Sequence, residues 1–206
     1  MRGAGKTTSI TALREKLGES GLTISTIEMD SYFKPLEECK APGGWDNPRN
    51  SNLGALAATI TAFKSGRKIR VPVGRVPRHG EIEIKEIDPA KSDVLLVEGI
   101  HGLESKISRL ADIKGFFYVP PGLQEIRTWL RDLERDKAKQ MPPEYYLGIN
   151  VRVRPWQSAL ILPRMKDAEI LFEQKLSMRD LDAIAGLMGF DNTRKNELAQ
   201  AWGITK

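Results

Sequence analysis

The sequence predicts an α/β fold in which a mainly parallel sheet is flanked by helices. Two observations carry this prediction. Short runs rich in β-branched residues alternate along the chain with stretches whose apolar residues recur at helical spacing. Residues 93–98 (DVLLVE) form an almost continuous apolar run, which is typical of a parallel strand buried on both faces. Strands that alternate with helices favour a parallel sheet, because each crossover between them carries a helix.

In the first half of the chain the expected elements are a helix over residues 6–17, a strand over 23–29, a loop over 33–51 and a helix over 52–63. The strand (TISTIEM) delivers Asp30 to its carboxyl end. The loop carries prolines and glycines without periodicity, and we expect it to be functional because loops of that length are uncommon in compact domains. Asn52 is the expected cap of the second helix, which ends at Ser65-Gly66.

In the second half, residues 69–73 and the alternating EIEIKEI of 81–87 predict a β-hairpin. After it come the strand 93–98, a short helix over 105–110, a strand over 115–119, a helix over 123–137, a helical stretch through Trp156, a strand over 168–172, and two small helices over 178–188 and 193–202. The segment NELAQAWGI near the end faintly resembles half of a helix-turn-helix, but two small helices packing on the core explain it better.

Length and composition indicate one domain over residues 1–206. The chain has 206 residues, of which 40% are hydrophobic and 29% charged, and no apolar run approaches the length that spans a bilayer. The single cysteine, Cys39, excludes an internal disulfide framework and fits a reducing cytoplasm. The net charge of +5 suits a nucleotide or sugar-phosphate substrate as well as nucleic acid. Without a basic tail or zinc spacing, nucleic acid is not an expected partner, and homo-oligomerisation stays open.

The first residues carry the second half of a phosphate-binding loop, the G-x-x-x-x-G-K-[ST] pattern: Gly3-Ala4-Gly5-Lys6-Thr7-Thr8. Glycines let successive backbone N–H groups turn toward phosphate oxygens, the lysine adds a positive charge, and the threonine hydroxyl ligates Mg²⁺. The first glycine of the pattern would fall one position before Met1. We therefore expect the native chain to have an apolar strand ending in glycine upstream.

Two carboxylates are expected at the same edge of the sheet as this loop. Asp30 follows the first strand and Glu98 ends the strand 93–98, and open α/β sheets bind ligands at the carboxyl ends of their strands. Phosphoryl transfer needs such an arrangement, because Mg²⁺ bridges the phosphates while a carboxylate orients the attacking hydroxyl. The alternative readings are a turn aspartate for Asp30 and a helix-capping carboxylate for Glu98.

Taken together, residues 3–172 resemble the uridine kinase and phosphoribulokinase family of P-loop kinases. Residues 3–17 (GAGKTTSITALREKL) look like its phosphate-binding loop and first helix. Residues 29–33 (MDSYF) are similar to its Asp-Asp-Phe-Tyr signature, and 97–100 (VEGI) look like its second acidic strand end. The resemblance implies ATP and Mg²⁺ as cofactors, Asp30 as catalytic base, and Glu98 with Thr7 at the metal. Residues 173–206 would then be a small helical extension.

Further segments resemble the family's acceptor site. Residues 45–48 (WDNP) resemble its Phe-Asp-His-Pro segment, which implies that Trp45 and Asp46 contact the acceptor. The hairpin followed by His79 resembles the one that bears a substrate-binding histidine, and 162–170 look like the closing segment. The alternatives are apolar packing for Trp45, a turn residue for Asp46 and a solvated turn histidine for His79.

Two departures from the family bear on the substrate. Where uridine kinases carry Tyr-Asp after the Pro-Val of the hairpin, this chain has Gly74-Arg75. The same region collects five basic residues, and arginine suits bidentate phosphate recognition: Arg67, Lys68, Arg70, Arg75 and Arg78. We take Arg75 and Arg78 as candidate acceptor contacts, against surface charge as the alternative.

The expected lid helix over 123–137 carries the last candidates. Arg131-Asp132 best matches the family's Arg-Asp pair, and Arg135 lies four residues on, so both arginines can reach one phosphate group. We assign Arg131 to the transferring phosphoryl group and Arg135 to the nucleotide, with pairing along a solvated face as the alternative. Another lid arginine expected before them is Thr128 here.

The first hypothesis is therefore an ATP-dependent kinase that phosphorylates a hydroxyl of a nucleoside or (phospho)sugar. Lys6 holds the β- and γ-phosphates in this reading, within a nucleotide site formed by residues 3–8. The alternative is a nucleotide-binding module without kinase chemistry, of a degenerate or regulatory kind.

Overall fold

A computed structural model describes residues 6–74, 83–120, 123–124, 127–128, 148, 151–152, 154–173, 175, 177–189, 191–201 and 204. The chain divides into two compact units, and each is described by itself. The larger unit comprises Lys6–Phe116 and Arg152–Ile170, and the smaller one comprises Met1–Gly5, Phe117–Val151 and Leu171–Lys206. Across the part of the chain that the structure describes, every helix is too short or too polar to span a bilayer.

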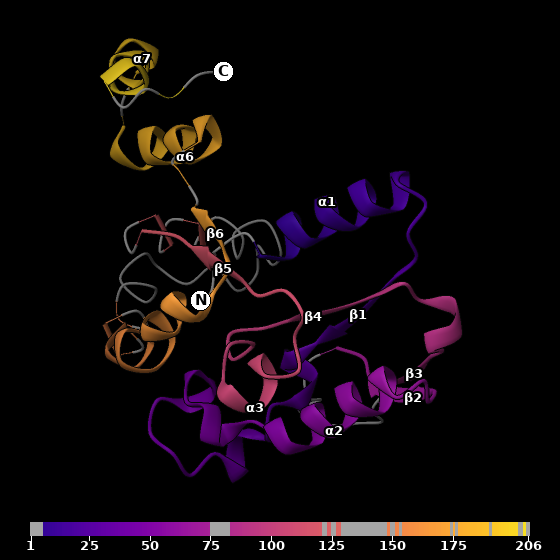
Figure 1. Cartoon of the computed structure of the whole chain (residues 1–206). Coiled ribbons are helices and arrows are strands. Elements are labelled where there is room, and N and C mark those ends of the chain that lie inside the picture. The colour runs from indigo at the N-terminus through magenta and orange to yellow at the C-terminus, as the bar shows by residue number, and fades with distance from the viewer. Residues whose placement is uncertain are drawn as a thin grey trace. The chain divides into compact units, whose positions relative to one another are not determined.

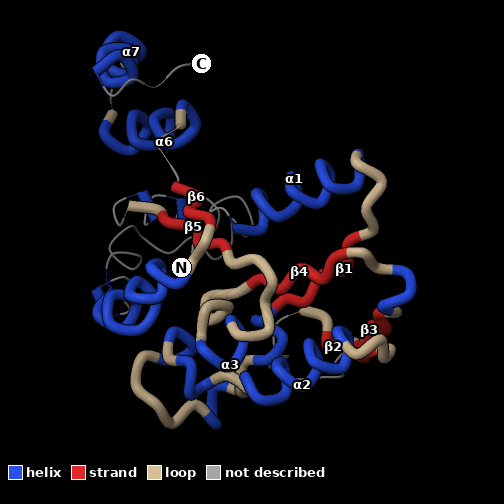
Figure 2. The backbone as a smooth tube through the Cα atoms, viewed as in Figure 1, coloured by secondary structure: helices blue, strands red, loops and turns tan. Residues whose placement is uncertain are grey.

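The larger unit alternates helices and strands, as the sequence predicts (Figures 1 and 2). Its regular elements are α1 (Lys6–Glu19), β1 (Ile24–Glu28), α2 (Leu53–Lys64), β2 (Ile69–Pro72), β3 (Ile84–Ile87), β4 (Val94–Glu98) and α3 (Ser105–Ser108). The expected α/β class is confirmed. Among the described residues the strands pair two by two, and the parallel part of the sheet consists of β1 and β4.

The parallel pair runs in register from Ile24 opposite Val94 to Glu28 opposite Glu98. Contacts at the start of the two strands fix this register. The Asp93 carboxylate accepts the Thr23 N–H at 2.8 Å, and the Thr23 carbonyl accepts the N–H groups of Asp93 and Val94 at 2.9 and 3.1 Å. Because a slip of one residue would reverse every side chain, these bonds also decide which residues reach the carboxyl edge.

The predicted hairpin is present as the antiparallel pair of β2 and β3, with Ile69 opposite Ile87 and Pro72 opposite Ile84. Ile69 and Ile87 are buried, and the alternation of buried and exposed residues along β2 agrees with a strand that has one core face. The turn of the hairpin lies outside the described residues. Lys85 of β3 donates its ammonium to the Thr26 carbonyl of β1 at 2.7 Å.

The hydrophobic core of the larger unit lies between these strands and α2. Its completely buried members are Leu56 of α2 and Val71 of β2, and Ile27 of β1 and Met29 are 1% exposed. Burying a side chain of this size stabilises the fold by about 1.5–3 kcal/mol. The core therefore holds the end of β1, where Met29 precedes Asp30, against the helix layer.

Helix α2 starts and ends close to where the sequence predicts, but its cap differs. Asn52 occupies the N-cap position, as predicted, but its side chain makes no capping hydrogen bond. Its ψ of 56° departs from the extended backbone that aims an N-cap side chain at the first helical N–H groups. At the other end Gly66 has a φ of +77°, and its N–H donates to the Phe63 carbonyl at 2.9 Å. This left-handed end is the reason for glycine there.

The segment expected as a loop over 33–51 has internal order. It contains short 3₁₀ turns at Leu36–Glu38, Gly44–Asp46 and Pro48–Asn50, and Phe33 and Ser51 form an isolated antiparallel bridge. Asn50, which is 1% exposed, holds the turns together: its amide donates to the carbonyls of Ala41 at 2.8 Å and Gly44 at 2.7 Å, and its oxygen accepts the Ala41 N–H at 3.1 Å. The segment therefore supports its side chains from its own backbone.

The helical stretch expected through Trp156 continues beyond it. Gln157–Ile161 form a π-helical turn, and Leu162–Asp167 form a 3₁₀ turn that contains Pro163. Single π-helical turns occur often at functional sites. This segment belongs to the larger unit, although the 35 residues Phe117–Val151, which belong to the smaller unit, separate Arg152–Ile170 in sequence from the rest of the larger unit.

The strands β5 (Gly115–Tyr118) and β6 (Ile170–Glu173) pair, and in the smaller unit the rings of Phe117 and Phe172 stack with centroids 4.5 Å apart. The expected last strand over 168–172 is thus present, and it starts two residues later and ends one residue later than predicted. The helices α6 (Met178–Met188) and α7 (Asn192–Ala201) confirm the two small helices expected at the end of the chain.

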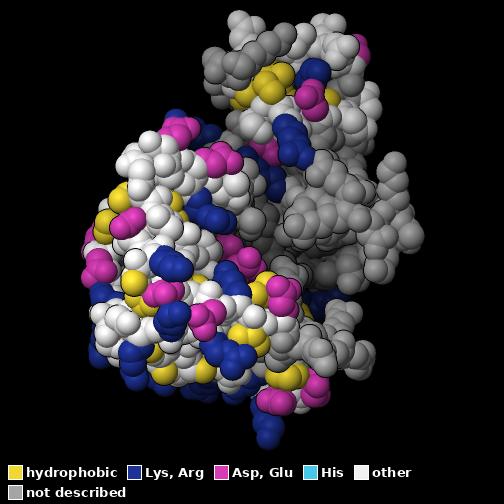
Figure 3. Space-filling view, turned by 90° about the vertical axis from the view of Figure 1, so that its right-hand side faces the viewer, with side chains coloured by type: hydrophobic (Ala, Val, Ile, Leu, Met, Phe, Trp, Pro, Cys, Tyr) yellow, Lys and Arg dark blue, Asp and Glu magenta, His cyan; other side chains and the backbone are white. Residues whose placement is uncertain are grey.

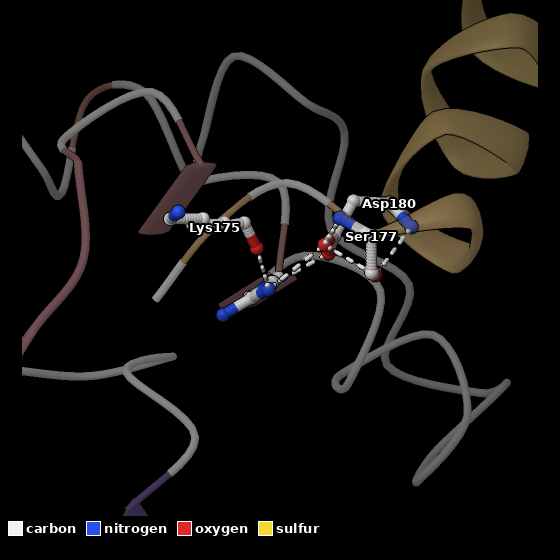
Figure 4. Close-up of polar contacts among 4 residues, drawn as sticks. Lys175, Ser177 and Asp180 are labelled. Atoms are coloured by element: carbon white, nitrogen blue, oxygen red, sulfur yellow. Dashed lines mark hydrogen bonds and ion pairs between the residues drawn. The ribbon is translucent and has the colours of Figure 1, made fainter. Parts of the chain in front are cut away.

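The start of α6 is fixed by a buried charge cluster (Figure 4). Ser177 and Asp180 form a capping box, and Arg127 donates a forked pair of hydrogen bonds to Asp180 at 2.9 and 2.8 Å and a third to the Lys175 carbonyl at 3.0 Å. Burial alone would raise the pKa of Asp180, but the hydrogen bonds from Arg127 and Ser177 lower it by more. This carboxylate is therefore held ionised.

Candidate functional site

Asp30 and Glu98 lie at one edge of the parallel pair. Glu98 is the last residue of β4, and Asp30 stands in the 3₁₀ turn Met29–Tyr32 that directly follows β1. Since β1 and β4 are parallel and in register, both residues leave the sheet at its carboxyl edge. Both are half-buried, which keeps their carboxylates within reach of a ligand.

Gly99 brings the two strand ends close together. A Cβ built on Gly99 would stand 2.7 Å from the Cγ and Sδ of Met29, and closer still to its Cβ. Met29 is buried and immediately precedes Asp30. Only glycine leaves room for this contact, so the residue after Glu98 sets how near β4 comes to the Asp30 turn.

The backbone of Lys6, Thr7 and Thr8 forms the first turn of α1. Figure 1 shows α1 and β1 running in opposite directions, as their short connection requires, so the start of the helix and the end of the strand lie toward the same side of the larger unit. The side chains of Lys6, Thr7 and Thr8 and the whole of Gly3, Ala4 and Gly5 lie outside what the structure describes.

Trp45 and Asp46 stand in the turn Gly44–Asp46. The indole N–H of Trp45 donates to the Lys34 carbonyl at 3.0 Å, and its ring stacks on Phe33 with centroids 5.9 Å apart and an interplanar angle of 15°. One face of the Trp45 ring and its N–H are therefore engaged in packing within the loop, which was the alternative interpretation of this residue. The Asp46 side chain is 6% exposed, and its Oδ1 accepts a hydrogen bond from Gln157 Nε2 at 3.3 Å.

His101 is a central residue that sequence reasoning missed. It is 2% exposed, its Nε2 lies 2.9 Å from the Trp45 carbonyl oxygen, and its ring meets Phe33 edge-on with centroids 6.2 Å apart. Burial lowers the pKa of His101, against the opposite effects of the Trp45 hydrogen bond and of the carboxylates of Glu104 and Asp46. Its contact with Trp45 joins residues 56 apart, which no local spacing signals.

Two further contacts attach residues 154–167 to this region. A Cβ on Gly43, whose φ is +92°, would stand 2.7 Å from Cγ of Trp156, so the indole packs directly on the glycine backbone. Arg164 donates a forked pair of hydrogen bonds to the two carboxylate oxygens of Glu104 at 3.2 and 3.1 Å. Sequence reasoning expected a helical stretch through Trp156 and a closing segment over 162–170, and it did not find these contacts.

The other predicted site residues lie outside the described part of the chain. These are Arg75, Arg78, His79, Arg131 and Arg135. Arg127, the arginine of the expected lid helix that the structure describes, makes the ion pair with Asp180. Thr128, in the place of an expected arginine, is buried and donates its hydroxyl to the Gln124 carbonyl at 2.8 Å.

The face drawn in Figure 3 carries charges of both signs. Figure 3 shows Lys and Arg side chains intermixed with Asp and Glu on the visible face, with only scattered hydrophobic atoms among the coloured residues. Within the described ranges no group of three or more His, Cys, Asp or Glu residues is arranged to hold a metal ion. One or two carboxylates suffice for Mg²⁺ when substrate phosphates complete its coordination, and Glu98 at the end of β4 is such a carboxylate.

The comparison with known proteins agrees with this geometry. Residues 1–181 match the model of the phosphoribulokinase / uridine kinase family. The chain belongs to this family. Its match covers the half loop, both acidic strand ends and the hairpin, so the resemblance inferred from the sequence is confirmed.

Two relatives of the chain differ in their names and in how much of their length the chain spans. A uridine kinase of Staphylococcus aureus is 28% identical over 178 residues, which cover 84% of this chain and 83% of the relative. The inorganic pyrophosphatase TTM2 of Arabidopsis thaliana is 26% identical over 175 residues, 85% of this chain. The chain spans about a quarter of the length of that protein, 25%.

Among solved structures, the chain is similar to a putative fructose transport system kinase from Silicibacter sp. TM1040. The TM-score is 0.64 with 18% sequence identity, and the match covers 84% of this chain and 85% of the other. At this identity the likeness shows the fold.

Proposed function

We propose that this chain is an ATP-dependent phosphotransferase that phosphorylates a hydroxyl of a nucleoside or a (phospho)sugar in the cytoplasm. The observation that supports it most is the in-register parallel pair that places Asp30 and Glu98 at one edge, in a chain of the phosphoribulokinase / uridine kinase family. Phosphoryl transfer requires two such carboxylates together with a phosphate-binding Gly-Lys-Thr segment, which this sequence carries at residues 5–7.

In this proposal each residue has one task. The backbone of residues 3–8 and the Lys6 ammonium bind the nucleotide phosphates, and Arg135 contacts them from the lid. Thr7 and Glu98 hold Mg²⁺, which when bound neutralises the phosphate charge. Asp30 accepts the proton of the acceptor hydroxyl, and Arg131 stabilises the transferring phosphoryl group.

The acceptor contacts come from two segments. Trp45 and Asp46 contact the acceptor from the loop, and Arg75, Arg78 and His79 contact it from the hairpin. The absence of Tyr-Asp after the hairpin's Pro-Val, together with its arginines, favours a phosphorylated or otherwise acidic acceptor over uridine.

A second candidate is a nucleotide-binding module without kinase chemistry. Thr128, buried and bonded to its own helix, occupies the place of an expected lid arginine. The match to a protein named inorganic pyrophosphatase, of which this chain spans 25%, shows that domains of this kind also occur inside longer proteins.

The test is ATP consumption over a panel of nucleosides, sugars and sugar phosphates. Removing a general base lowers turnover by about 10²–10⁴-fold, so we expect Asp30→Asn to do this while ATP affinity, measured by calorimetry, changes less than about threefold. The matched control is Asp112→Asn, an exposed aspartate that pairs with Lys64. Full turnover by Asp30→Asn would refute the base, and nucleotide binding without turnover of any acceptor would favour the second candidate.

A further inference from the structure

Three segments of the larger unit meet in one buried cluster beside the proposed site. Phe33 follows Asp30 by three residues, His101 follows Glu98 by three residues, and Trp45 precedes Asp46. The Phe33 ring stacks on Trp45 and meets His101 edge-on, and His101 bonds to the main chain of Trp45. The cluster therefore links each acidic strand end to the acceptor turn Gly44–Asp46.

The polar contact in this cluster has a defined direction. The Trp45 carbonyl can only accept, so Nε2 of His101 carries the hydrogen and donates it over 2.9 Å. His101 is 2% exposed, so an apolar side chain in its place would remove a hydrogen-bond donor from the Trp45 carbonyl at a position that the rest of the protein covers. The bond thus ties the position of the Trp45 main chain to the residue three places after Glu98.

The other side of the acceptor turn is held by the π-helical turn. Gln157 donates its amide to Asp46 Oδ1 at 3.3 Å, and both side chains are 6% exposed. Trp156, the preceding residue, packs on the backbone of Gly43, where a side chain would clash. Among the described residues, Asp46 is thereby oriented by a neutral amide donor.

We propose that His101 and Gln157 are positioning residues that fix the Trp45–Asp46 turn against the Asp30–Glu98 edge and so set the affinity for the acceptor. The inference rests on the proposed phosphotransferase function. His101 locates the main chain of the turn, and Gln157 orients its carboxylate. Neither side chain acts on the nucleotide.

The experiment compares variants that remove the donor with one that keeps it. His101→Leu and Gln157→Met fill the space without donating, whereas His101→Gln keeps an amide N–H where Nε2 stands. Ile107→Ala is the control for general destabilisation, because Ile107 is 3% exposed in the same β4–α3 segment and contacts the core instead of the loop. For each, kcat and the KM values for acceptor and ATP are measured, together with amide hydrogen exchange of residues 41–51.

We expect His101→Leu and Gln157→Met to raise the acceptor KM at least about tenfold and the exchange of residues 41–51 by a similar factor, since a freed loop opens locally. The KM for ATP stays within about twofold, and His101→Gln restores the acceptor KM. An unchanged acceptor KM, a His101→Gln variant as impaired as His101→Leu, or equal effects in Ile107→Ala would overturn the proposal. If the wild-type chain turns over no acceptor, the phosphotransferase proposal fails by itself. The exchange of residues 41–51 then still decides whether these two residues hold the turn.

Discussion

Gly99 offers a direct test of how closely the two acidic strand ends are packed. In Gly99→Ala the new methyl group would stand 2.7 Å from the Cγ and Sδ of Met29, inside their van der Waals contact distance of about 3.5–4.0 Å. Met29 is 1% exposed and surrounded by the core, so it has little room to retreat. Overpacking of this kind costs about 1–3 kcal/mol. At this chain length that loss lowers Tm by about 2–12 °C.

The matched control is Gly102→Ala, three residues on in the same turn. A Cβ there would have its nearest neighbours at 3.5 Å from the Gly99 carbonyl oxygen and 3.9 Å from Met29 Sδ, which is ordinary contact. We expect its stability to remain within about 0.5 kcal/mol of wild type. Both variants are followed by thermal unfolding and by urea titration. The close approach of β4 to the Asp30 turn would be refuted if Gly99→Ala were as stable as wild type. It would also be refuted if Gly102→Ala were destabilised as much as Gly99→Ala.

Two further predictions concern buried charges. Asp180→Asn leaves the guanidinium of Arg127, which is 18% exposed, without its carboxylate, and we expect the free energy of unfolding in urea to fall by about 3 kcal/mol. The control is Glu197→Gln, which breaks an exposed pair with Arg194 and should cost less than about 0.5 kcal/mol. Equal losses in the two variants would contradict a buried pair. Burial lowers the pKa of His101 in the folded state. Below the ordinary histidine pKa of about 6.5, the unfolded chain therefore binds more protons than the folded chain does. Stability should therefore fall by up to about 1.4 kcal/mol per pH unit from there toward the folded pKa. His101→Gln should remove this part of the slope, and an unchanged slope would show that His101 titrates normally.

The elements of the larger unit were predictable because each has a local pattern. The apolar run that forms β4, the alternation in β2 and β3, and the glycine that ends α2 all act over a few residues. The positions of Asp30 and Glu98 at strand ends follow from the same patterns. Asn52 shows the limit of this reasoning, because residue type predicted a side-chain cap while the backbone conformation at that position prevents one.

The contacts that shape the acceptor turn were not predictable in this way. Gln157 and Asp46 are 111 residues apart, and His101 and Trp45 are 56 apart. A glutamine and a histidine also have no strong preference that would mark them as buried partners in sequence. Such pairs follow from the tertiary path of the chain, which decides which polar atoms meet where water is excluded.

The bond from Lys85 to the Thr26 carbonyl also bears on self-association. In the described part of the chain β1 pairs with β4 as its one strand partner, and a strand with an open edge is a template for another molecule's backbone. The Lys85 ammonium lies 2.7 Å from the Thr26 carbonyl oxygen of β1, and a strand from another molecule would have to displace it before pairing there. Within the described part of the chain, Lys85 of the hairpin therefore hinders edge-to-edge pairing at Thr26 of β1.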